Sequence, residues 1–371
     1  MRTLLHGINW LRLSLLGLPL LAGLGGCNLE QTASSDEAAS MVEFIEPDIQ
    51  RLSRMNRPLL FEVASDFSEG VAMVRTENQV GYIDRNGSLV INVVDQNVVV
   101  ATDYTEDLAV VRVGDFYGYI NRSGDWAIEV KFRQAKPFSE GLAAVKGGTQ
   151  YGFINHQGEW AIEPQFDLTE NFSNGLAVVK SGDVYGYIDT SGKFVMAPQY
   201  ADAWSFSDGL AVFKQGGKYG YLGKDGQVAI APAYDGAFNF SDGLARVRQG
   251  SEFGFIDANG KVVINFTLDF ASDFSDGLAV VLINGKWGYL DQTGKVAIEP
   301  QFDYAADFSE GLAAVQAGGL YGFINRAGDW VVEPSFSNAG RFSEGFARVQ
   351  MNNQWGFVDQ EGNLMTSAHS R

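Results

Sequence analysis

A short motif, Phe-Ser-acid-Gly, recurs along this chain at a constant interval and limits the fold more than any other feature of the sequence. Its aromatic residue recurs every 34 residues at Phe138, Phe172, Phe206, Phe240, Phe274, Phe308 and Phe342, and earlier copies open at Phe67 and Tyr104. The interval from Phe67 to Tyr104 is 37, so the first unit carries three additional residues. Repeated units bury their apolar surface against their neighbours, and the spacing therefore predicts a repeat architecture.

A second marker, in most units aromatic-Gly-aromatic, recurs in the same register and sets the number of units. Its glycine is found at Gly81, Gly118, Gly152, Gly186, Gly220, Gly254, Gly288, Gly322 and Gly356. The chain therefore contains nine units, the last of which is shortened by the C-terminus. In a strand the two aromatic residues share one face, and the glycine lies on the other, where a second backbone can approach. We expect stacked units to form aromatic ladders, with the glycines as close-packing seams between units.

Each unit contains three β-prone segments. In the unit from Phe308 to Ala339 these are LAAVQ, LYGFIN and DWVVEPSF, separated by the turns AGG and RAG. Short strands between glycine turns predict antiparallel hairpins, and no segment of the repeats shows a sustained helical period. The predicted fold class is all-β: a tandem array of nine three-stranded β-hairpin repeats of about 34 residues.

The arrangement of these units depends on their strand number. Propellers typically have about four to eight blades of four strands each, which nine three-stranded units fit poorly. A meander of three strands also ends on the side opposite to its start, so the Phe-Ser-acid-Gly segment would have to cross back. We therefore expect an open or superhelical β-solenoid, with a closed propeller-like ring as the alternative.

The stretch GKWGYLDQTGKVAIEPQFDYAADFSEGLAAV (Gly285–Val315) resembles the bacterial WG-repeat family. The resemblance extends from about Phe61 to Leu364, and the tryptophan that names the family is present as Trp287 and Trp355. The other units carry Tyr or Phe at this position, except that the first unit has Val80. Similarity to this family implies an architecture far more than an activity.

The N-terminal residues resemble a bacterial lipoprotein signal peptide. Two arginines border an apolar run, Leu13–Leu24, which is too short for an ordinary membrane-spanning helix. The LGGC sequence that ends at Cys27 resembles a lipobox, which implies cleavage before Cys27 and lipid attachment to it. An ordinary cleaved signal is the alternative. In Gram-negative lipoproteins the residue after the cysteine influences sorting, and Asn28 favours the outer membrane.

The sequence thus predicts four regions. Residues 1–26 form the signal peptide, and residues 27–58 comprise the lipidated cysteine and a disordered tether, with a short cap helix near its end. Residues 59–364 form the repeat domain, and residues 365–371 form a tail.

Charge and residue usage exclude several classes of function. The chain has 27 Lys and Arg against 45 Asp and Glu, a net charge of −18, which argues against nucleic-acid binding and against polybasic attachment to lipid. A single cysteine excludes an intrachain disulfide, and three histidines leave no His/Cys metal cluster. His156 is a turn residue without a recognisable catalytic partner, so we expect no enzyme, no metal and no cofactor.

The acidic residues of the repeats are interpreted as turn residues. The third position of the motif is Glu or Asp in eight units and Asn174 in one, so a row of calcium ligands is the less favoured reading. In the Ile-Asp-x-x-Gly segments Asp and Asn interchange, which suits a turn that binds its own backbone and does not suit a metal or a general base.

The aromatic residues are the better candidates for ligand binding. Exposed rings could stack on sugars, whereas buried rings would form core ladders. The candidate binding residues are Tyr117, Tyr151, Tyr185, Tyr219, Trp287, Tyr321 and Trp355. Buried tyrosine hydroxyls need partners, so we expect any polar groove to lie beside the tyrosine-rich units three to five.

These features together predict a lipid-anchored binding or scaffold protein of the cell envelope. An extended array of repeats presents a long surface, and the leading expectation is protein–protein interaction at the periplasmic face of the outer membrane. Cell-wall glycan binding by exposed aromatics is the alternative, and a hydrolase with an unrecognised site is a third hypothesis.

Overall fold

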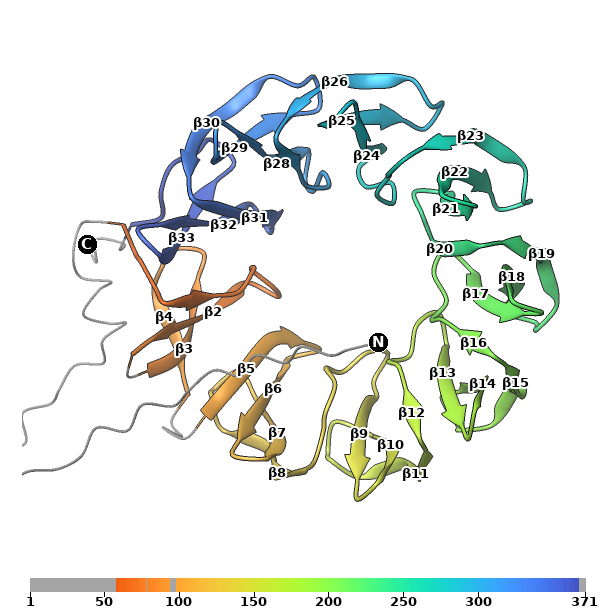
Figure 1. Cartoon of the computed structure of the whole chain (residues 1–371). Coiled ribbons are helices and arrows are strands. Elements are labelled where there is room, and N and C mark those ends of the chain that lie inside the picture. The colour runs from red at the N-terminus through yellow and green to blue at the C-terminus, as the bar shows by residue number, and fades with distance from the viewer. Residues whose placement is uncertain (1–57, 78, 94–97, 367–371) are drawn as a thin grey trace, which may run out of the picture. The chain divides into compact units, whose positions relative to one another are not determined.

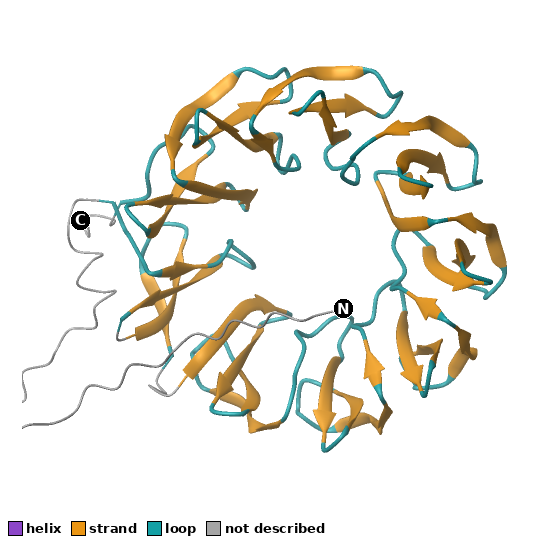
Figure 2. Cartoon of the chain, viewed as in Figure 1, coloured by secondary structure: helices purple, strands orange, loops and turns teal. Residues whose placement is uncertain are grey.

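The computed structural model describes residues 58–77, 79–93 and 98–366. The predicted signal peptide, Cys27 and the tether up to residue 57 lie outside the described residues. The described residues form nine small antiparallel sheets that follow one another around a ring, so the repeats build a nine-bladed β-propeller (Figure 1). The regular elements in this part of the chain are all strands (Figure 2), and it has no helix that could cross a membrane.

The first five blades are built as follows. Blade 1 has β1 (Val63–Ala64), β2 (Val71–Thr76), β3 (Gln79–Asp84) and β4 (Leu89–Asn92). Blade 2 has β5 (Val98–Thr105), β6 (Leu108–Val113), β7 (Phe116–Ile120) and β8 (Trp126–Phe132), and blade 3 has β9 (Ala143–Gly147), β10 (Gln150–Ile154) and β11 (Trp160–Phe166). Blade 4 has β12 (Leu168–Thr169), β13 (Leu176–Ser181), β14 (Val184–Asp189) and β15 (Phe194–Tyr200), and blade 5 has β16 (Asp202–Ala203), β17 (Leu210–Gln215), β18 (Lys218–Gly223) and β19 (Val228–Tyr234).

The last four blades continue the same order. Blade 6 has β20 (Gly236–Ser241), β21 (Leu244–Gln249), β22 (Glu252–Asp257) and β23 (Val262–Leu268), and blade 7 has β24 (Leu278–Ile283), β25 (Lys286–Asp291) and β26 (Val296–Phe302). Blade 8 has β27 (Tyr304–Ala305), β28 (Leu312–Ala317), β29 (Leu320–Asn325) and β30 (Trp330–Phe336), and blade 9 has β31 (Asn338–Ser343), β32 (Phe346–Met351) and β33 (Gln354–Asp359).

The strands of one blade differ in how many of their residues are buried. In blade 4, β13 and β14 carry runs of three or four consecutive buried residues, because a neighbouring blade packs on each of their faces. The outer strand β15 instead alternates between exposed and buried positions, since only one of its faces is covered. The apolar runs and the alternating runs of the sequence therefore report the position of each strand in its blade.

An innermost strand ahead of the three predicted ones distinguishes the blades from the predicted three-stranded unit. In blades 2, 6 and 9 this strand, β5, β20 or β31, is six to eight residues long. Strands pair in chain order from the centre of the ring to its outer edge, and β12, β16 and β27 are innermost strands of only two residues (Figure 1). In blades 3 and 7 this strand is reduced to single bridges, Ala135 to Val145 and Ala271 to Val281.

The predicted open or superhelical solenoid is therefore wrong, and the closed ring that we gave as the alternative is correct. The segment that precedes each Phe-Ser-acid-Gly motif, and not the motif itself, crosses from the outer edge of one blade to the inner edge of the next. This crossing adds the fourth strand, so every blade starts and ends on the same sides and the units can repeat around an axis.

The ring is closed by a strand that both ends of the described chain build together. Leu364 pairs with Val358, and Phe61 pairs with Trp355, so the two segments form successive parts of the outer strand of blade 9. Where they meet, the Leu59 amide donates to the carbonyl of Met365 at 3.1 Å. The C-terminal shortening of the last repeat is thus made good by residues that precede the first.

Aromatic pairs form the core between blades. The strand that holds the repeat glycine is called the third strand of its blade: β3, β7, β10, β14, β18, β22, β25, β29 and β33. The aromatic residue directly after this glycine packs against the opening ring of the next motif, with centroids 4.7–5.1 Å apart at all nine interfaces. The pair Phe357 and Phe67 belongs to the closing interface between blades 9 and 1. Five of the buried tyrosines also donate to a backbone carbonyl of the next blade: Tyr82, Tyr119, Tyr187, Tyr221 and Tyr289.

The Phe-Ser-acid-Gly motif is a clasp between neighbouring turns. In eight units its serine donates to the carbonyl of the next aromatic residue, as Ser309 does to Phe342 at 2.8 Å and Ser343 to Phe67 at 2.7 Å. The acid adopts the positive φ of a turn and accepts from a backbone amide of the next turn, as Glu310 does from Gly345 at 2.8 Å. The predicted turn is confirmed, but its side chains bind the next blade and not their own backbone.

The Ile-Asp-x-x-Gly segments are turns that bind their own backbone, as predicted. Asp189 Oδ1 accepts from the amides of Ser191 at 2.9 Å and Lys193 at 3.1 Å. Asparagine makes the same pair of bonds in other blades, for instance Asn325 with Ala327 and Asp329. The oxygen and not the charge is what the turn needs, which explains why Asp and Asn interchange.

The glycine of the third strand makes room for the outer strand of its own blade. The expectation that these glycines form close-packing seams between units is therefore wrong. An added Cβ on Gly152 would lie 2.4 Å from the carbonyl oxygen of Ile162 and 2.8 Å from the nitrogen of Pro164. Both atoms belong to the outer strand β11, which is bulged where it passes over Gly152.

Asp103 makes the stability of the fold depend on pH. Burial raises the pKa of this carboxyl, and the nearby Asp66 carboxylate adds to the effect. Because the folded pKa lies above the unfolded value of about 3.9, the group favours folding at low pH, and this contribution is lost as pH rises through the folded pKa. We therefore expect Asp103→Asn to raise the melting temperature at pH 7 and to leave it unchanged at about pH 3.

A matched substitution tests this expectation. Asp66 is a neighbouring aspartate, but its Oδ1 lies 2.7 Å from Arg348 Nε, so Asp66→Asn should lower the melting temperature at pH 7. Thermal unfolding of both variants and the parent at the two pH values is the measurement. An Asp103→Asn variant that is less stable than the parent at pH 7 would contradict the assignment.

Candidate binding surface at the hairpin end of the ring

The two ends of the blades differ in what they present. One end carries the Phe-Ser-acid-Gly turns and the Ile-Asp-x-x-Gly turns, and we call it the clasp end. The other carries the hairpins between second and third strands and the crossings between blades, and we call it the hairpin end. In blade 3 the hairpin end comprises residues 147–150 and the crossing at residues 133–134.

The seven candidate aromatic residues from the sequence all lie near the hairpin end. Each is the first aromatic residue of a third strand, and each is half-buried: Tyr117, Tyr151, Tyr185, Tyr219, Trp287, Tyr321 and Trp355. Two of them, Trp287 and Tyr321, are linked through the ring of Tyr304.

Cations lie over five of these rings: four in blades 2–5, and Trp355 in blade 9, whose ring centroid is 5.2 Å from the Arg348 guanidinium. The residue opposite the aromatic on the second strand is Arg112, Lys146, Lys180 or Lys214 in blades 2–5. Their charged groups lie 4.8–6.0 Å from the centroids of Tyr117, Tyr151, Tyr185 and Tyr219. A cation over an aromatic face is attracted to it and occupies the surface on which a sugar would stack. We call these four blades the cationic sector.

Blades 7 and 8 present a different, aromatic sector. The residues opposite Trp287 and Tyr321 are Leu282 and Gln316, which carry no charge. Trp287 lies 5.1 Å from Phe270 and 5.9 Å from Tyr304, between centroids, and Tyr304 lies 6.0 Å from Tyr321.

Two residues of this sector, Phe270 and Tyr304, were missed in the sequence. They are 37% and 43% exposed and belong to the innermost segments of their blades. The signal was a large apolar residue directly after the aspartate that follows the outer strand, in a segment too short to read as a strand.

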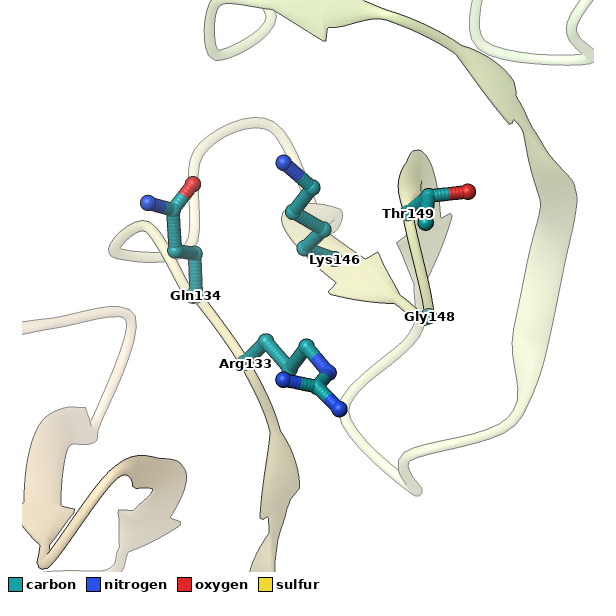
Figure 3. A pocket seen from close by; sticks show the side chains of 5 residues that line it. All are labelled: Arg133, Gln134, Lys146, Gly148 and Thr149. Atoms are coloured by element: carbon teal, nitrogen blue, oxygen red, sulfur yellow. The ribbon is translucent and has the colours of Figure 1, made fainter.

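An open pocket lies within the cationic sector at blade 3. Arg133, Gln134, Lys146, Gly148 and Thr149 line a cavity of about 430 Å³ (Figure 3). The Tyr151 hydroxyl donates to Gln134 Oε1, and burial raises the pKa of that tyrosine, so it stays a donor. This pocket lies beside unit three, one of the units beside which the sequence places any polar groove.

The remaining candidates lie at the clasp end. His156 Nε2 is 3.1 Å from Glu106 Oε2, and its ring stacks on Phe138 with centroids 4.3 Å apart. The motif acids bind backbone amides, as described above. Among the described residues there is no group of three or more His, Cys, Asp or Glu side chains that could hold a metal ion.

Fold and surface together define a β-propeller built from short repeats. The WG-containing repeat model matches residues 117–146, 151–185, 185–219, 219–252, 253–287, 287–321 and 321–355, which is well over half of the chain. The chain therefore belongs to the family of proteins with WG-containing repeats. The first match begins at Tyr117 in the third strand of blade 2 and the last ends at Trp355 in that of blade 9. The structure adds blade 1, the inner strands of blade 2 and the closing strand.

Solved structures are similar to this chain at low sequence identity. A eukaryotic initiation factor is 11% identical, with a TM-score of 0.60 over 79% of this chain and 94% of its own. BamB from Moraxella catarrhalis is 10% identical, with a TM-score of 0.39 over 82% of this chain and 96% of its own. No curated protein is significantly similar to the chain. The first similarity supports the fold alone.

Proposed function

We propose that this protein is an envelope scaffold, anchored through a lipid on Cys27, that binds a protein partner at the hairpin end of its propeller. The observation that carries the proposal is the division of this end into a cationic sector and an aromatic sector. The chain as a whole has a net charge of −18. Cations at equivalent positions of six adjacent blades, the four of the cationic sector with Arg75 and Arg248 on either side, are therefore a local departure from its charge. A charged patch beside exposed aromatic anchors is a combination typical of protein interfaces.

The lipid anchor and the outer-membrane address rest on the sequence around Cys27. A lipid anchor would hold the propeller close to the membrane, and we propose that its hairpin end binds the partner. No bound metal or cofactor enters this proposal, and the surface is proposed for binding and not for catalysis.

Cell-wall glycan binding is the second candidate function. The observation that favours it is the aromatic sector, where Phe270 and Tyr304 are exposed and no cation pairs with Trp287. Aromatic rings offer apolar faces on which sugars stack. The cationic sector does not favour this candidate, because its ring faces are already covered.

The two candidates make different predictions for Tyr304→Ala. A partner isolated from solubilised envelope as a stoichiometric complex should bind the parent at least tenfold more tightly than Tyr304→Ala, because loss of an interface aromatic costs more than about 1.4 kcal/mol. Phe194→Ala is the matched control, since Phe194 is 41% exposed but lies on the outer strand β15.

Three outcomes decide between the proposals. Binding that is lost in Tyr304→Ala and kept in Phe194→Ala supports the scaffold. Sedimentation with peptidoglycan that is lost in Tyr304→Ala, in the absence of a protein complex, supports glycan binding. In the same cells Cys27→Ala should move the protein out of the membrane fraction, and unchanged membrane association of that variant would refute the lipid anchor.

A further inference from the structure

Three blades contain a carboxylate that is bound by the hairpin of its own blade. The aspartate that follows an outer strand accepts, through Oδ2, the backbone N–H of a glycine in the next hairpin. The pairs are Asp167 with Gly182 at 2.7 Å, Asp235 with Gly250 at 2.8 Å, and Asp303 with Gly318 at 2.9 Å. The hairpin end of the repeat therefore has a recurrent position for an anion.

A lysine completes this position in two of the blades. Lys218 lies 2.5 Å from Asp235 Oδ1, and Lys286 lies 2.6 Å from Asp303 Oδ1. The lysine, together with the glycine amide, holds the pKa of each carboxyl below its usual value. The combination of one amide and one nearby cation thus stabilises the ionised carboxylate.

Blade 3 has the same position without the carboxylate. The backbone register is the same, because the Arg133 amide donates to the carbonyl of Lys146 at 3.2 Å as the Asp167 amide does to that of Lys180 at 3.0 Å. Arg133 thus replaces the aspartate, and Gly148 occupies the hairpin position of Gly182. Among the described carboxylates, none forms an ion pair with Arg133 or Lys146.

The cavity at blade 3 surrounds this position. Lys146 comes from the second strand, Arg133 and Gln134 from the crossing, and Gly148 and Thr149 from the hairpin (Figure 3). The ammonium of Lys146 is 5.2 Å from the centroid of the Tyr151 ring, which limits its positions. Since the Tyr151 hydroxyl donates to Gln134 Oε1, the amide nitrogen of Gln134 remains a donor. The lining offers donors and two positive charges and no acid.

We propose that the blade 3 pocket binds a carboxylate group of the partner protein, in the place that an internal aspartate fills in blades 4, 6 and 8. The backbone N–H of Gly148 and the cations Arg133 and Lys146 are its donors. The inference rests on the proposed function only in taking the carboxylate from a protein. An acidic side chain and a C-terminal carboxylate share this chemistry, and the test below distinguishes them.

The test is a nuclear magnetic resonance titration of the full chain labelled with ¹⁵N, observed at the amides of Gly148 and Thr149. The probes are four short peptides with acetylated N-termini: Gly-Glu-Gly amide, its Gln analogue as the amide, Gly-Gly-Gly with a free C-terminal carboxylate, and Gly-Gly-Gly amide. We expect a saturable shift of the Gly148 amide with the peptides that carry a carboxylate and none with their neutral counterparts. Of the two acidic peptides, the one that binds more tightly identifies the source.

Arg133→Asp is the decisive variant. It restores the internal aspartate of blades 4, 6 and 8, so it should move the Gly148 amide resonance without any peptide and weaken peptide binding at least tenfold. Lys146→Gln should weaken binding several-fold through loss of one charge, which keeps the proposal testable if Arg133→Asp fails to fold. Lys193→Gln is the control, because Lys193 lies in the Ile-Asp-x-x-Gly turn at the clasp end, and peptide binding by this variant should equal that of the parent.

Specific outcomes would overturn the proposal. Equal shifts with acidic and neutral peptides, or unchanged binding by Arg133→Asp, would show that no carboxylate occupies the pocket. Saturable binding of inorganic phosphate without binding of either acidic peptide would reject the carboxylate. If a partner complex survives Arg133→Asp, the pocket proposal fails and the scaffold proposal stands. If acidic peptides bind but no partner complex forms, the pocket proposal stands and the scaffold proposal fails.

Discussion

Phe61→Ala is expected to lower the free energy of unfolding by about 3–5 kcal/mol and to open the ring between blades 9 and 1. Phe61 is completely buried and exchanges two backbone hydrogen bonds of 2.7 Å with Trp355. Its side chain fills the place that an outer-strand aromatic such as Phe302 fills in other blades. In a linear array the two terminal units would have one neighbour each, whereas closure gives every blade two.

The measurement combines urea unfolding with hydrogen exchange, and Phe302→Ala is its control. Phe302 is 3% exposed and pairs with Trp287 as Phe61 pairs with Trp355, so both variants lose a similar amount of buried apolar surface. Phe61→Ala should speed exchange at Trp355 and at the Gly70 amide, which Glu344 holds across the closing interface. A loss of less than about 1 kcal/mol, or unchanged exchange at these amides, would mean that closure does not depend on Phe61.

Gly152→Ala is expected to destabilise the protein by at least about 1–3 kcal/mol, although alanine is the better residue for an unstrained strand. The added Cβ would lie 2.4 Å from the Ile162 carbonyl oxygen, and this oxygen belongs to the backbone of the bulged outer strand. Strand β11 would have to move away, which breaks its pairing with β10 and exposes Phe166. Thermal and urea unfolding would measure the loss.

Gly223→Ala is the matched control for this prediction. Gly223 lies at the end of the third strand of blade 5, and the atom nearest to an added Cβ is Asp225 Oδ1, which can rotate away. Other blades carry Asp or Asn at this position, so a side chain fits, and the stability should change by less than about 0.5 kcal/mol. Equal stability of Gly152→Ala and Gly223→Ala would refute the close approach of β11 to Gly152.

The candidate binding residues show how much of the proposed binding surface could be predicted from the sequence. The seven aromatic positions were predicted from the repeat, and the structure places all of them near one end of the ring. Their separation into two sectors depends on the residues that pair with them across the hairpin, such as Lys146 with Tyr151 and Leu282 with Trp287. Cross-strand register cannot be read reliably from the repeat alone, because one residue of slip would put these side chains on opposite faces.

In the sequence, the blade 3 pocket is marked only by one residue that differs from its counterparts in other units, and the sequence gives no reason for the difference. Arg133 stands where other units have Asp167, Asp235 and Asp303, and the repeat alignment shows this difference. That the aspartate binds a hairpin glycine fifteen residues further on becomes evident only from the folded blade. The chemistry of the position is therefore a tertiary property, although its residues are ordered by the repeat.

The closing strand could have been found from the sequence. Phe61 precedes Phe67 by six residues, as Phe302 precedes Phe308, so the outer-strand signature stands ahead of the first complete unit. The first repeat is preceded by the outer-strand part of a repeat, and the last repeat lacks this part. Together the two segments complete one blade. The two-residue innermost strands, in contrast, are too short to recognise, and without them the strand count favoured a solenoid.

The sequence by itself determined the repeat, the number of units, the three long strands of each unit and the turns that bind their own backbone, because these depend on local spacing and on residue type. The tertiary structure alone decided that the array closes, since the angle between blades depends on how each buried ring packs against the next motif. It also decided which aromatic faces are covered and where an anion position is left without its aspartate, because both depend on side chains from different strands that meet only in the folded ring.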